Sequence, residues 1–394
     1  MEPHTIQITA MAAGGDGLGR DEGGRVTFVP GALAGETVSV VLEQVKKDFA
    51  RARLVQVLEA SPDRVEPPCP FVASGCGGCD WQHVAPAAQR RLKLGIVSDA
   101  LRRQAHLDVA VAEGPDLPPL GYRTTLRGRS LEGRFALRER RGHDLVAVDP
   151  CLVAHPLLGE LVETGRFPDG EVVLRAGART GERLVVVDGE PGATSVPDGV
   201  RVVTTDELDA GTRAWIHEEV AGRLFRVSAR SFFQARPDGA EALLDAVATA
   251  LGASSQPGGH LVDLYGGVGL FAGSLPGWRS VTLVEQSPSA VADARVNLAD
   301  RDARVVRADV DHWGPSHADA VVADPPRAGL RKPGVRRVVA TGAPVIALVS
   351  CDPAALGRDA RLLVEAGYDL TSVSLVDLFP HTSHVEVVSR FVRR

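Results

Sequence analysis

The chain of 394 residues is 44% hydrophobic, which is enough for about two or three domains with sizeable cores. Its net charge of −6 at pH 7 argues against a globally basic nucleic-acid binder, so any such binding must rest on local patches. No apolar run approaches the roughly 18 residues of a membrane span, and the polar start MEPHTIQITA is no secretory signal, so we expect a cytoplasmic protein.

Residues 5–60 contain short strand-like segments, such as IQITAMA, GRVTFVP and ETVSVVLEQV, which glycine-rich turns separate. Strands at such short intervals predict a small antiparallel barrel, a fold that often binds oligonucleotides. We therefore expect an N-terminal barrel domain over residues 1–60. The proline-rich segment SPDRVEPP, which follows, is interpreted as a linker.

Four of the five cysteines, all later in the sequence than this linker, form a candidate metal or cluster site. They are Cys69, Cys76, Cys79 and Cys151. Four thiolates suit zinc or an iron–sulfur cluster equally by number, but a single CxxC pair with two isolated cysteines favours a [4Fe-4S] cluster over a zinc ribbon. Buried structural thiols or a disulfide pair are the alternative, although the absence of a secretory signal argues against an oxidising compartment.

The region 61–227 is predicted to form a central β-rich domain. Its strand-like segments include FALRER, DLVAVD, EVVLRAG and ERLVVVDG. Residues 88–106 have apolar side chains at helical spacing, and we expect this amphipathic helix to pack on the C-terminal domain. The segment 122–141 is rich in arginine and could track RNA phosphates, or it could form a solvated sheet face.

From residue 228 onward, helical segments alternate with apolar strands such as LVDLY, SVTLVE, ADAVVAD and PVIALVS. Buried strands that alternate with helices predict a parallel, doubly wound, Rossmann-like sheet. The fold class is therefore α/β, with the catalytic domain at residues 228–394. Ligands of such sheets bind beyond the carboxyl ends of the strands.

The first strand of this region is followed by the turn YGGVG, where the missing side chains of Gly266, Gly267 and Gly269 let a cofactor approach the backbone. Glu285 ends the next strand, in the position of an acid that holds ribose hydroxyls. Asp309 follows a third strand, where it could meet an adenine. The glycine pattern also fits a dinucleotide site, so at this step an NAD enzyme remains an alternative.

Three further residues of the C-terminal region can carry chemistry. Asp324 ends a buried strand and is followed by two prolines, a pattern typical of methyltransferases that act on planar nitrogenous substrates. Cys351 follows the strand PVIALVS and would face the same crevice. Glu386 lies within an apolar strand, where burial would raise the pKa of its carboxyl and make it a proton acceptor.

A thiol, a carboxylate, a nucleoside-type cofactor pocket and local basic charge together suit methylation of uracil at carbon 5. Addition of the Cys351 thiolate at carbon 6 makes carbon 5 nucleophilic towards the methyl group of S-adenosylmethionine. Glu386 would then remove the carbon 5 proton, and the thiol would be expelled.

The motifs SFFQ, DLYGGVG, DPPRAGL, SCDP and FPHTSHVE resemble those of the S-adenosylmethionine-dependent RNA uridine-5-methyltransferases, over nearly the whole chain. The resemblance implies a TRAM barrel over about residues 1–60, a central β domain and a C-terminal methyltransferase fold. It implies an RNA substrate, and we expect a uridine of 23S rRNA rather than the T-loop of tRNA. A monomer is the default expectation, without contact to a membrane.

The resemblance also implies the roles of single residues. Cys351 matches the nucleophile, and Glu386 matches the base. The positions of the cofactor pocket match Gln234, Tyr265, Glu285, Asp309 and Asp324. The ligands of a [4Fe-4S] cluster match Cys69, Cys76, Cys79 and Cys151, which favours iron over zinc.

The chain departs from the family pattern at Leu270, where an asparagine is common, and in a spacer of one extra residue between Cys69 and Cys76. Two other functions compete with this interpretation. An amino methyltransferase would use Asp324 without a nucleophilic thiol. A cluster-containing RNA-binding protein would have lost its activity, which intact Cys351 and Glu386 argue against.

Overall fold

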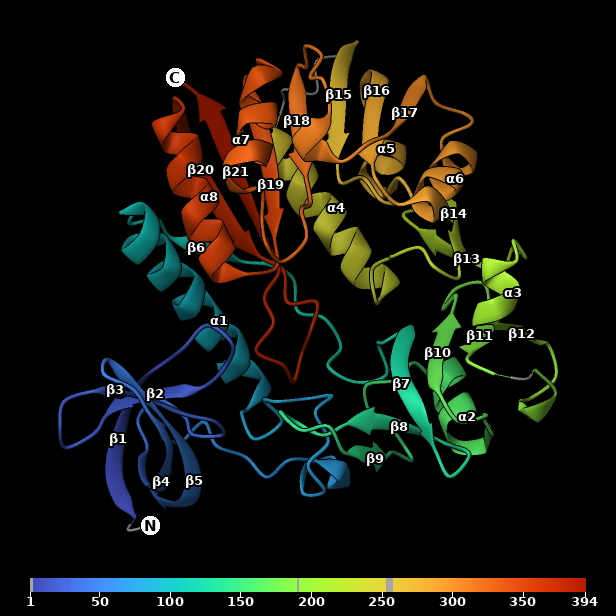
Figure 1. Ribbon diagram of the computed structural model, residues 1–394. Helices are drawn as coiled ribbons and strands as arrows, with labels where there is room; N and C mark the ends of the chain where they lie inside the picture. Colours follow the sequence, from blue (N-terminus) through green and yellow to red (C-terminus); the bar gives the residue numbers. More distant parts are fainter. Residues whose placement is uncertain (1–2, 190, 253–257) are drawn as a thin grey trace.

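The computed structural model describes residues 3–189, 191–252 and 258–394. A small barrel, a central sheet and a large sheet follow one another along the chain (Figure 1). The barrel and the central sheet lie below the large sheet in Figure 1, and the loop before the last strand reaches down between them. No helix among the described residues is both long and apolar enough to cross a membrane.

The N-terminal strands close into a barrel in the order β1-β2-β3-β5-β4, as the short strands and turns predicted, but β3 and β5 pair in parallel, so the barrel is not wholly antiparallel. Their bounds are β1 His4–Met11, β2 Gly17–Arg20, β3 Val26–Val29, β4 Thr37–Val45 and β5 Phe49–Glu59. Ile6, Ile8, Val38 and Val40 alternate into the barrel interior and form its core. Gly19 is required there, because a Cβ atom would lie 2.3 Å from the Ile6 side chain.

The central sheet has six strands in the order β12-β11-β10-β7-β8-β9. Its strands are β7 Thr125–Leu131, β8 Arg134–Arg138, β9 Leu145–Ala147, β10 Glu171–Ala176, β11 Arg183–Val187 and β12 Val200–Thr204. The helices α2 (Pro156–Thr164) and α3 (Thr205–Asp209) accompany it, and a separate ribbon of β13 (Trp215–Val220) and β14 (Arg223–Ser228) leads on to the large sheet. A capping box of Thr204 and Glu207 begins α3.

The helix α1 (Pro86–Ala100) and the strand β6 (Val111–Glu113) pack with the C-terminal half, although they precede the central sheet in sequence. β6 pairs in parallel with β20, at the edge of the large sheet. α1 continues into a π-helical turn, Leu101–Ala105, which packs against α8. The helix predicted over residues 88–106 thus packs on the C-terminal domain, as expected, although it lies within the central region of the sequence.

The large sheet has eight strands in the order β17-β16-β15-β18-β19-β21-β20-β6. Its C-terminal strands are β15 Gly259–Leu264, β16 Trp278–Glu285, β17 Ala303–Arg307, β18 Ala320–Ala323, β19 Val345–Ser350, β20 Tyr368–Leu375 and β21 Val387–Arg393. The strands β17, β16, β15, β18 and β19 are parallel, as predicted. β21 is antiparallel to both of its neighbours, so the sheet is mixed rather than wholly parallel.

Helices cover both faces of the large sheet (Figure 1), which confirms the doubly wound α/β class. They are α4 Pro237–Leu251, α5 Leu270–Ser274 and α6 Pro288–Asn297 on one face, and α1, α7 (Arg331–Ala340) and α8 (Pro353–Glu365) on the other. Two separate apolar cores result, because alternate side chains of each strand point to opposite faces.

Candidate active site

The predicted site residues of the C-terminal half gather at the carboxyl edge of the large sheet. In the parallel register, Leu264 of β15 pairs with Ala323 of β18. Tyr265 and Asp324 directly follow these residues and therefore leave neighbouring strands at the same edge. Cys351 follows Ser350, the last residue of β19, which is the next strand along.

Cys351 and Glu386 flank the last pair of an antiparallel ladder. Ser350 of β19 pairs with Val387 of β21, so Cys351 comes just after one partner and Glu386 just before the other. Glu386 was predicted to lie within this last strand, but β21 begins one residue later, because residue 386 still belongs to the loop that leads into it. Glu386 is 5% exposed, and its carbonyl accepts the amide hydrogen of Val376 at 2.8 Å. The Glu386 charge is among the causes that raise the pKa of Cys351, so the thiol and the carboxyl group lie near each other.

Burial raises the pKa values of Cys351, Asp324 and Glu386, and repulsion by neighbouring charges adds to this at Cys351 and Glu386. Burial raises the pKa of Cys351 to about 12, the nearby Glu386 and Asp324 add to this, and Arg327 opposes them. Burial raises the pKa of Asp324 to about 7, and that of Glu386 rises well above its usual range through burial and the Asp324 charge. Both carboxylates are therefore stronger bases than in water.

A cavity of about 330 Å³, which we call the Cys351 cavity, opens beside this group. Residues from the barrel domain, from the segment 77–80 beside the cysteines, from the central domain and from the C-terminal domain line this cavity together. Among them are Gly14, Gly77, Gly78, Asp80, Arg140, Arg141, Arg327, Cys351 and Thr382–Val385. The guanidinium groups at its rim make it suitable for a ligand with phosphates.

The glycine turn after β15 is held open by Glu285. The Glu285 carboxylate accepts the amide hydrogens of Gly267 at 3.1 Å and of Ser287 at 2.6 Å. Gly267 has a φ of +54°, and a Cβ atom there would meet nothing within 4 Å, so open space borders the backbone of the turn. Tyr265, with a φ of +60°, turns the chain out of the strand just before it. This turn fits a nucleoside-type cofactor that contacts the main chain.

The other cofactor residues of the prediction are more dispersed. Asp309 is half-exposed and accepts the amide hydrogen of Asp311 at 2.9 Å, after β17. Gln234 is 7% exposed, in the segment between β14 and α4. Leu270, where the family often has asparagine, is 6% exposed and packs into the apolar core. It is thus a core residue at the start of α5.

The four predicted cluster ligands line one small cavity of about 30 Å³, the thiol cavity. Cys69, Cys76, Cys79 and Cys151 border it together with Arg123 and apolar side chains. Burial raises the pKa of Cys76, of Cys151 and, to about 12, of Cys79, so without a bound cation these thiols are neutral. Within the described ranges, no three Cys, His, Asp or Glu side chains converge as ligands of a single metal ion would.

Known proteins are similar to this chain over most of its length. The TRAM domain profile matches residues 4–55, and the profile described as tRNA (Uracil-5-)-methyltransferase matches residues 303–393. An uncharacterized RNA methyltransferase of Streptomyces avermitilis is 38% identical, over 98% of both chains. The 23S rRNA (uracil(1939)-C(5))-methyltransferase RlmD of Photorhabdus laumondii is 32% identical, over 99% of this chain and 97% of that protein.

The chain belongs to the RNA uracil-C5 methyltransferase family. Among solved structures, the Pyrococcus abyssi tRNA (uracil-54, C5)-methyltransferase in complex with S-adenosyl-L-homocysteine has a TM-score of 0.74 and 25% identity, over 98% of this chain and 99% of that one. The resemblance stated from the motifs is confirmed. So is the enzyme class, an S-adenosylmethionine-dependent RNA uracil-C5 methyltransferase.

Several residues around the site of this uracil-C5 methyltransferase were not predicted as site residues. Asp80 and Arg140 line the Cys351 cavity from outside the C-terminal half, and only the fold brings them there. Arg327 follows the two prolines after Asp324, so the motif DPPR could have indicated it. Lys93 and Gln89 of α1 are buried and contact the loop before Glu386, and no motif marks them.

The arginine-rich segment 122–141 does not form one continuous phosphate track. Arg123 lines the thiol cavity, and Arg134 is paired with Asp149. Arg141 binds both carboxylate oxygens of Asp16 in the barrel, at 2.6 and 2.7 Å. The alternation of arginines along the segment therefore serves several separate contacts, and two of its members, Arg140 and Arg141, reach the Cys351 cavity.

Proposed function

We propose that this enzyme forms 5-methyluridine at one uridine of 23S rRNA, with Cys351 as the nucleophile and Glu386 as the base. The observation that supports the proposal is the last pair of the ladder between β19 and β21, Ser350 with Val387, which Cys351 directly follows and Glu386 directly precedes. The cavity at Cys351 has Arg140, Arg141 and Arg327 among its lining residues, as an RNA substrate requires.

The chemistry follows from the two side chains. Cys351 loses its thiol proton to water and adds to C6 of uracil as the thiolate, and C5 thereby becomes nucleophilic. S-adenosylmethionine, when bound, supplies an electrophilic methyl group that C5 takes up. Glu386 then accepts the C5 proton while the C6–sulfur bond breaks and the C5–C6 double bond returns. Glu386 passes this proton to water, so the thiolate and the carboxylate are both regenerated.

The carboxyl edge of the sheet supports a cofactor site beside this pair. Tyr265 and Glu285 border the open glycine turn, and Asp309 follows the neighbouring strand. Asp324 would lie between the cofactor and the uracil, because it follows β18, the strand between β15 with its glycine turn and β19 with Cys351. Gln234 is assigned to the same pocket from the family motif.

A uridine within a stacked RNA cannot present C6 to a thiol, so the target base must leave the stack and enter the Cys351 cavity. Arg140 and Arg327 have no carboxylate partner within ion-pair distance among the described residues, so both can meet phosphates. The double variant Arg140→Ala/Arg327→Ala should bind RNA more weakly, because two phosphate contacts are lost. The slope of log affinity against log salt should fall in magnitude by about 1.4.

Equilibrium RNA binding over a series of salt concentrations, without cofactor, checks this expectation. Arg361→Ala on the exposed side of α8 is the matched control, since within the described part of the chain Arg361 makes one ion pair, a 3.8 Å contact with Glu365. An unchanged affinity and salt slope in the double variant would show that RNA does not enter along this rim.

The preference for 23S rRNA rests on the relative of Photorhabdus laumondii, which is more similar in sequence than the Pyrococcus tRNA enzyme. The high structural similarity of the tRNA enzyme makes a tRNA T-loop uridine the second candidate. Labelled S-adenosylmethionine with unmodified 23S rRNA and tRNA in separate reactions decides between them. Label in 5-methyluridine of 23S rRNA alone supports the proposal, and label in tRNA alone refutes it.

We further propose that Cys69, Cys76, Cys79 and Cys151 hold a [4Fe-4S] cluster. The four thiols line one cavity together, and a single CxxC pair with two isolated cysteines favours a cluster over a zinc ribbon. When bound, a cluster would link Cys69, Cys76 and Cys79 to Cys151 and so join residues 69–79 to the central domain. Protein purified without oxygen should contain about four irons and four sulfides per chain. One zinc per chain instead would contradict the assignment.

A further inference from the structure

The segment Val376–Glu386, here called the base loop, joins β20 to β21 and ends at the proposed base. The amide hydrogen of Val376 binds the carbonyl of Glu386 at 2.8 Å, which closes the loop at its two ends. Between them, His381 has a φ of +64°, a left-handed conformation that a residue with a side chain rarely adopts. Such a conformation persists only where its surroundings hold it.

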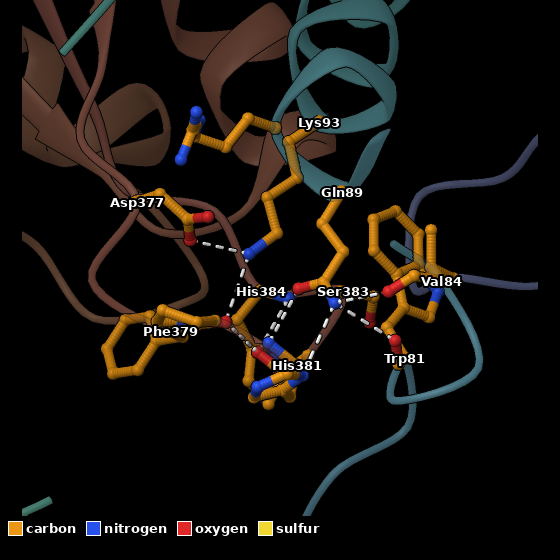
Figure 2. A network of polar contacts seen from close by, with 12 residues as sticks. Trp81, Val84, Gln89, Lys93, Asp377, Phe379, His381, Ser383 and His384 are labelled. Carbon is orange, nitrogen blue, oxygen red and sulfur yellow. Dashed lines mark hydrogen bonds and ion pairs between the residues drawn. The ribbon is translucent and has the colours of Figure 1, made fainter. Parts of the chain in front are cut away.

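Gln89 of α1 holds the strained residue directly (Figure 2). The His381 amide hydrogen binds Oε1 of Gln89 at 2.7 Å, and the His381 carbonyl accepts the amide hydrogen of Trp81 at 2.9 Å. Nε2 of Gln89 in turn donates to the carbonyls of Val84 at 2.8 Å and Trp81 at 3.2 Å. Both main-chain groups of His381 are thus fixed by elements outside the loop.

Lys93 holds the beginning of the base loop from the next turn of α1 (Figure 2). Its ammonium group donates to Asp377 at 2.7 Å and to the carbonyl of Phe379 at 3.0 Å. The Lys93 side chain is fully buried, and that of Asp377 is 9% exposed. A buried charge pair costs desolvation and gains little stability over apolar packing, so its presence calls for another explanation than folding energy.

Two further hydrogen bonds fix the middle of the loop. The Asp80 carboxylate accepts the amide hydrogen of Ser383 at 3.0 Å, and the Tyr122 hydroxyl donates to the carbonyl of Pro380 at 3.1 Å. The barrel touches the same region, because Trp81 donates its ring N–H to the carbonyl of Gly15 at 3.1 Å. The conformation of the base loop is therefore determined by residues that precede it by more than 250 positions.

We infer that Gln89 and Lys93 are positioning residues, which hold the base loop so that Glu386 meets the C5 proton of the uracil. The inference rests on the proposed role of Glu386. Neither residue lines the Cys351 cavity, and the part of the base loop that does, Thr382–Val385, is held separately by the contact of Ser383 with Asp80, so adduct formation should be little affected. Their loss should shift Glu386 and slow proton removal more than the preceding steps. A misplacement of about 1 Å can cost about 100-fold in rate.

The test compares two steps of one reaction in the double variant Lys93→Met/Asp377→Leu. Both charges are removed together, because Lys93→Met alone would leave an unpaired carboxylate in the interior. Rapid quench with labelled RNA and S-adenosylmethionine gives the rate of covalent adduct formation and the rate of product release. We expect formation within about threefold of the wild type and release slowed at least about tenfold, with an unchanged melting temperature.

The variant Gln89→Met tests the second contact in the same way and replaces the first test if the double variant does not fold. Arg102→Met is the matched control. Arg102 lies in the turn just after α1, and among the described residues its side chain is paired only with Asp99, at an exposed position. Release at the wild-type rate, or equal slowing of both steps, overturns the inference. Glu386→Gln is run in parallel. If it accumulates no adduct, the assignment of the base has failed rather than the role of α1.

Discussion

Replacing Cys351 with alanine is expected to abolish methyl transfer to RNA. Without thiolate addition at C6, C5 of uracil is not nucleophilic enough to take up a methyl group. Removal of a catalytic nucleophile costs a factor on the order of 10⁶ in other enzymes. Cys351 lies at the end of a buried strand beside an open cavity, and alanine fits the same space, so we expect the fold to persist.

Single-turnover transfer of labelled methyl groups measures this effect free of product release. RNA affinity and melting temperature serve as controls, and both should remain near the wild-type values. Cys351→Ser retains a polar atom of similar size and should be equally inactive, because a hydroxyl is a much weaker nucleophile here. More than a few per cent of the wild-type rate in either variant would contradict a covalent mechanism through this residue.

Replacing Glu386 with glutamine is expected to trap the enzyme on its RNA. Thiolate addition and methyl transfer need no base at C5, so the methylated adduct should form. Its release requires loss of the C5 proton, and removal of a general base slows such a step by about 10²- to 10⁴-fold. Glutamine has nearly the shape of glutamate, so the buried position of residue 386 should tolerate it.

On a denaturing gel with labelled RNA, the trapped complex should appear as a slowly migrating band, because a covalent adduct survives denaturation. Asp324→Asn is the informative comparison, because the pKa of Asp324 is raised by burial to about 7 and its charge also acts at Cys351. If Asp324→Asn traps the adduct while Glu386→Gln turns over normally, the two carboxylates exchange roles and the present assignment of the base is wrong.

Local sequence patterns predicted much of the fold. Short strand-like segments separated by glycine-rich turns in 5–60 indicated the barrel, and the strands that alternate with helices after residue 228 indicated the doubly wound sheet. The antiparallel direction of β21 was not predicted, because a buried strand has the same apolar pattern in either direction. The pairing of β6 with β20 depends on contacts between distant parts of the chain.

Some residues of the candidate site could be predicted from the sequence, and others could not. Cys351 and Glu386 stand in short motifs, so the sequence alone could indicate them. Lys93 could not be found so, since a lysine on an amphipathic helix is usually exposed, and only the approach of the base loop buries it. Arg141 is likewise explained by a single distant partner, Asp16 of the barrel.

The measurement that tests the covalent mechanism most directly uses 23S rRNA in which 5-fluorouridine replaces uridine. The fluorine at C5 cannot leave as a proton, so an adduct with the enzyme persists after methyl transfer. Digestion and mass spectrometry then locate the attached nucleotide. The account predicts a methylated fluorouridine on the peptide that contains Cys351. Methylated adenosine or cytidine without an adduct, or an adduct on another residue, would contradict it.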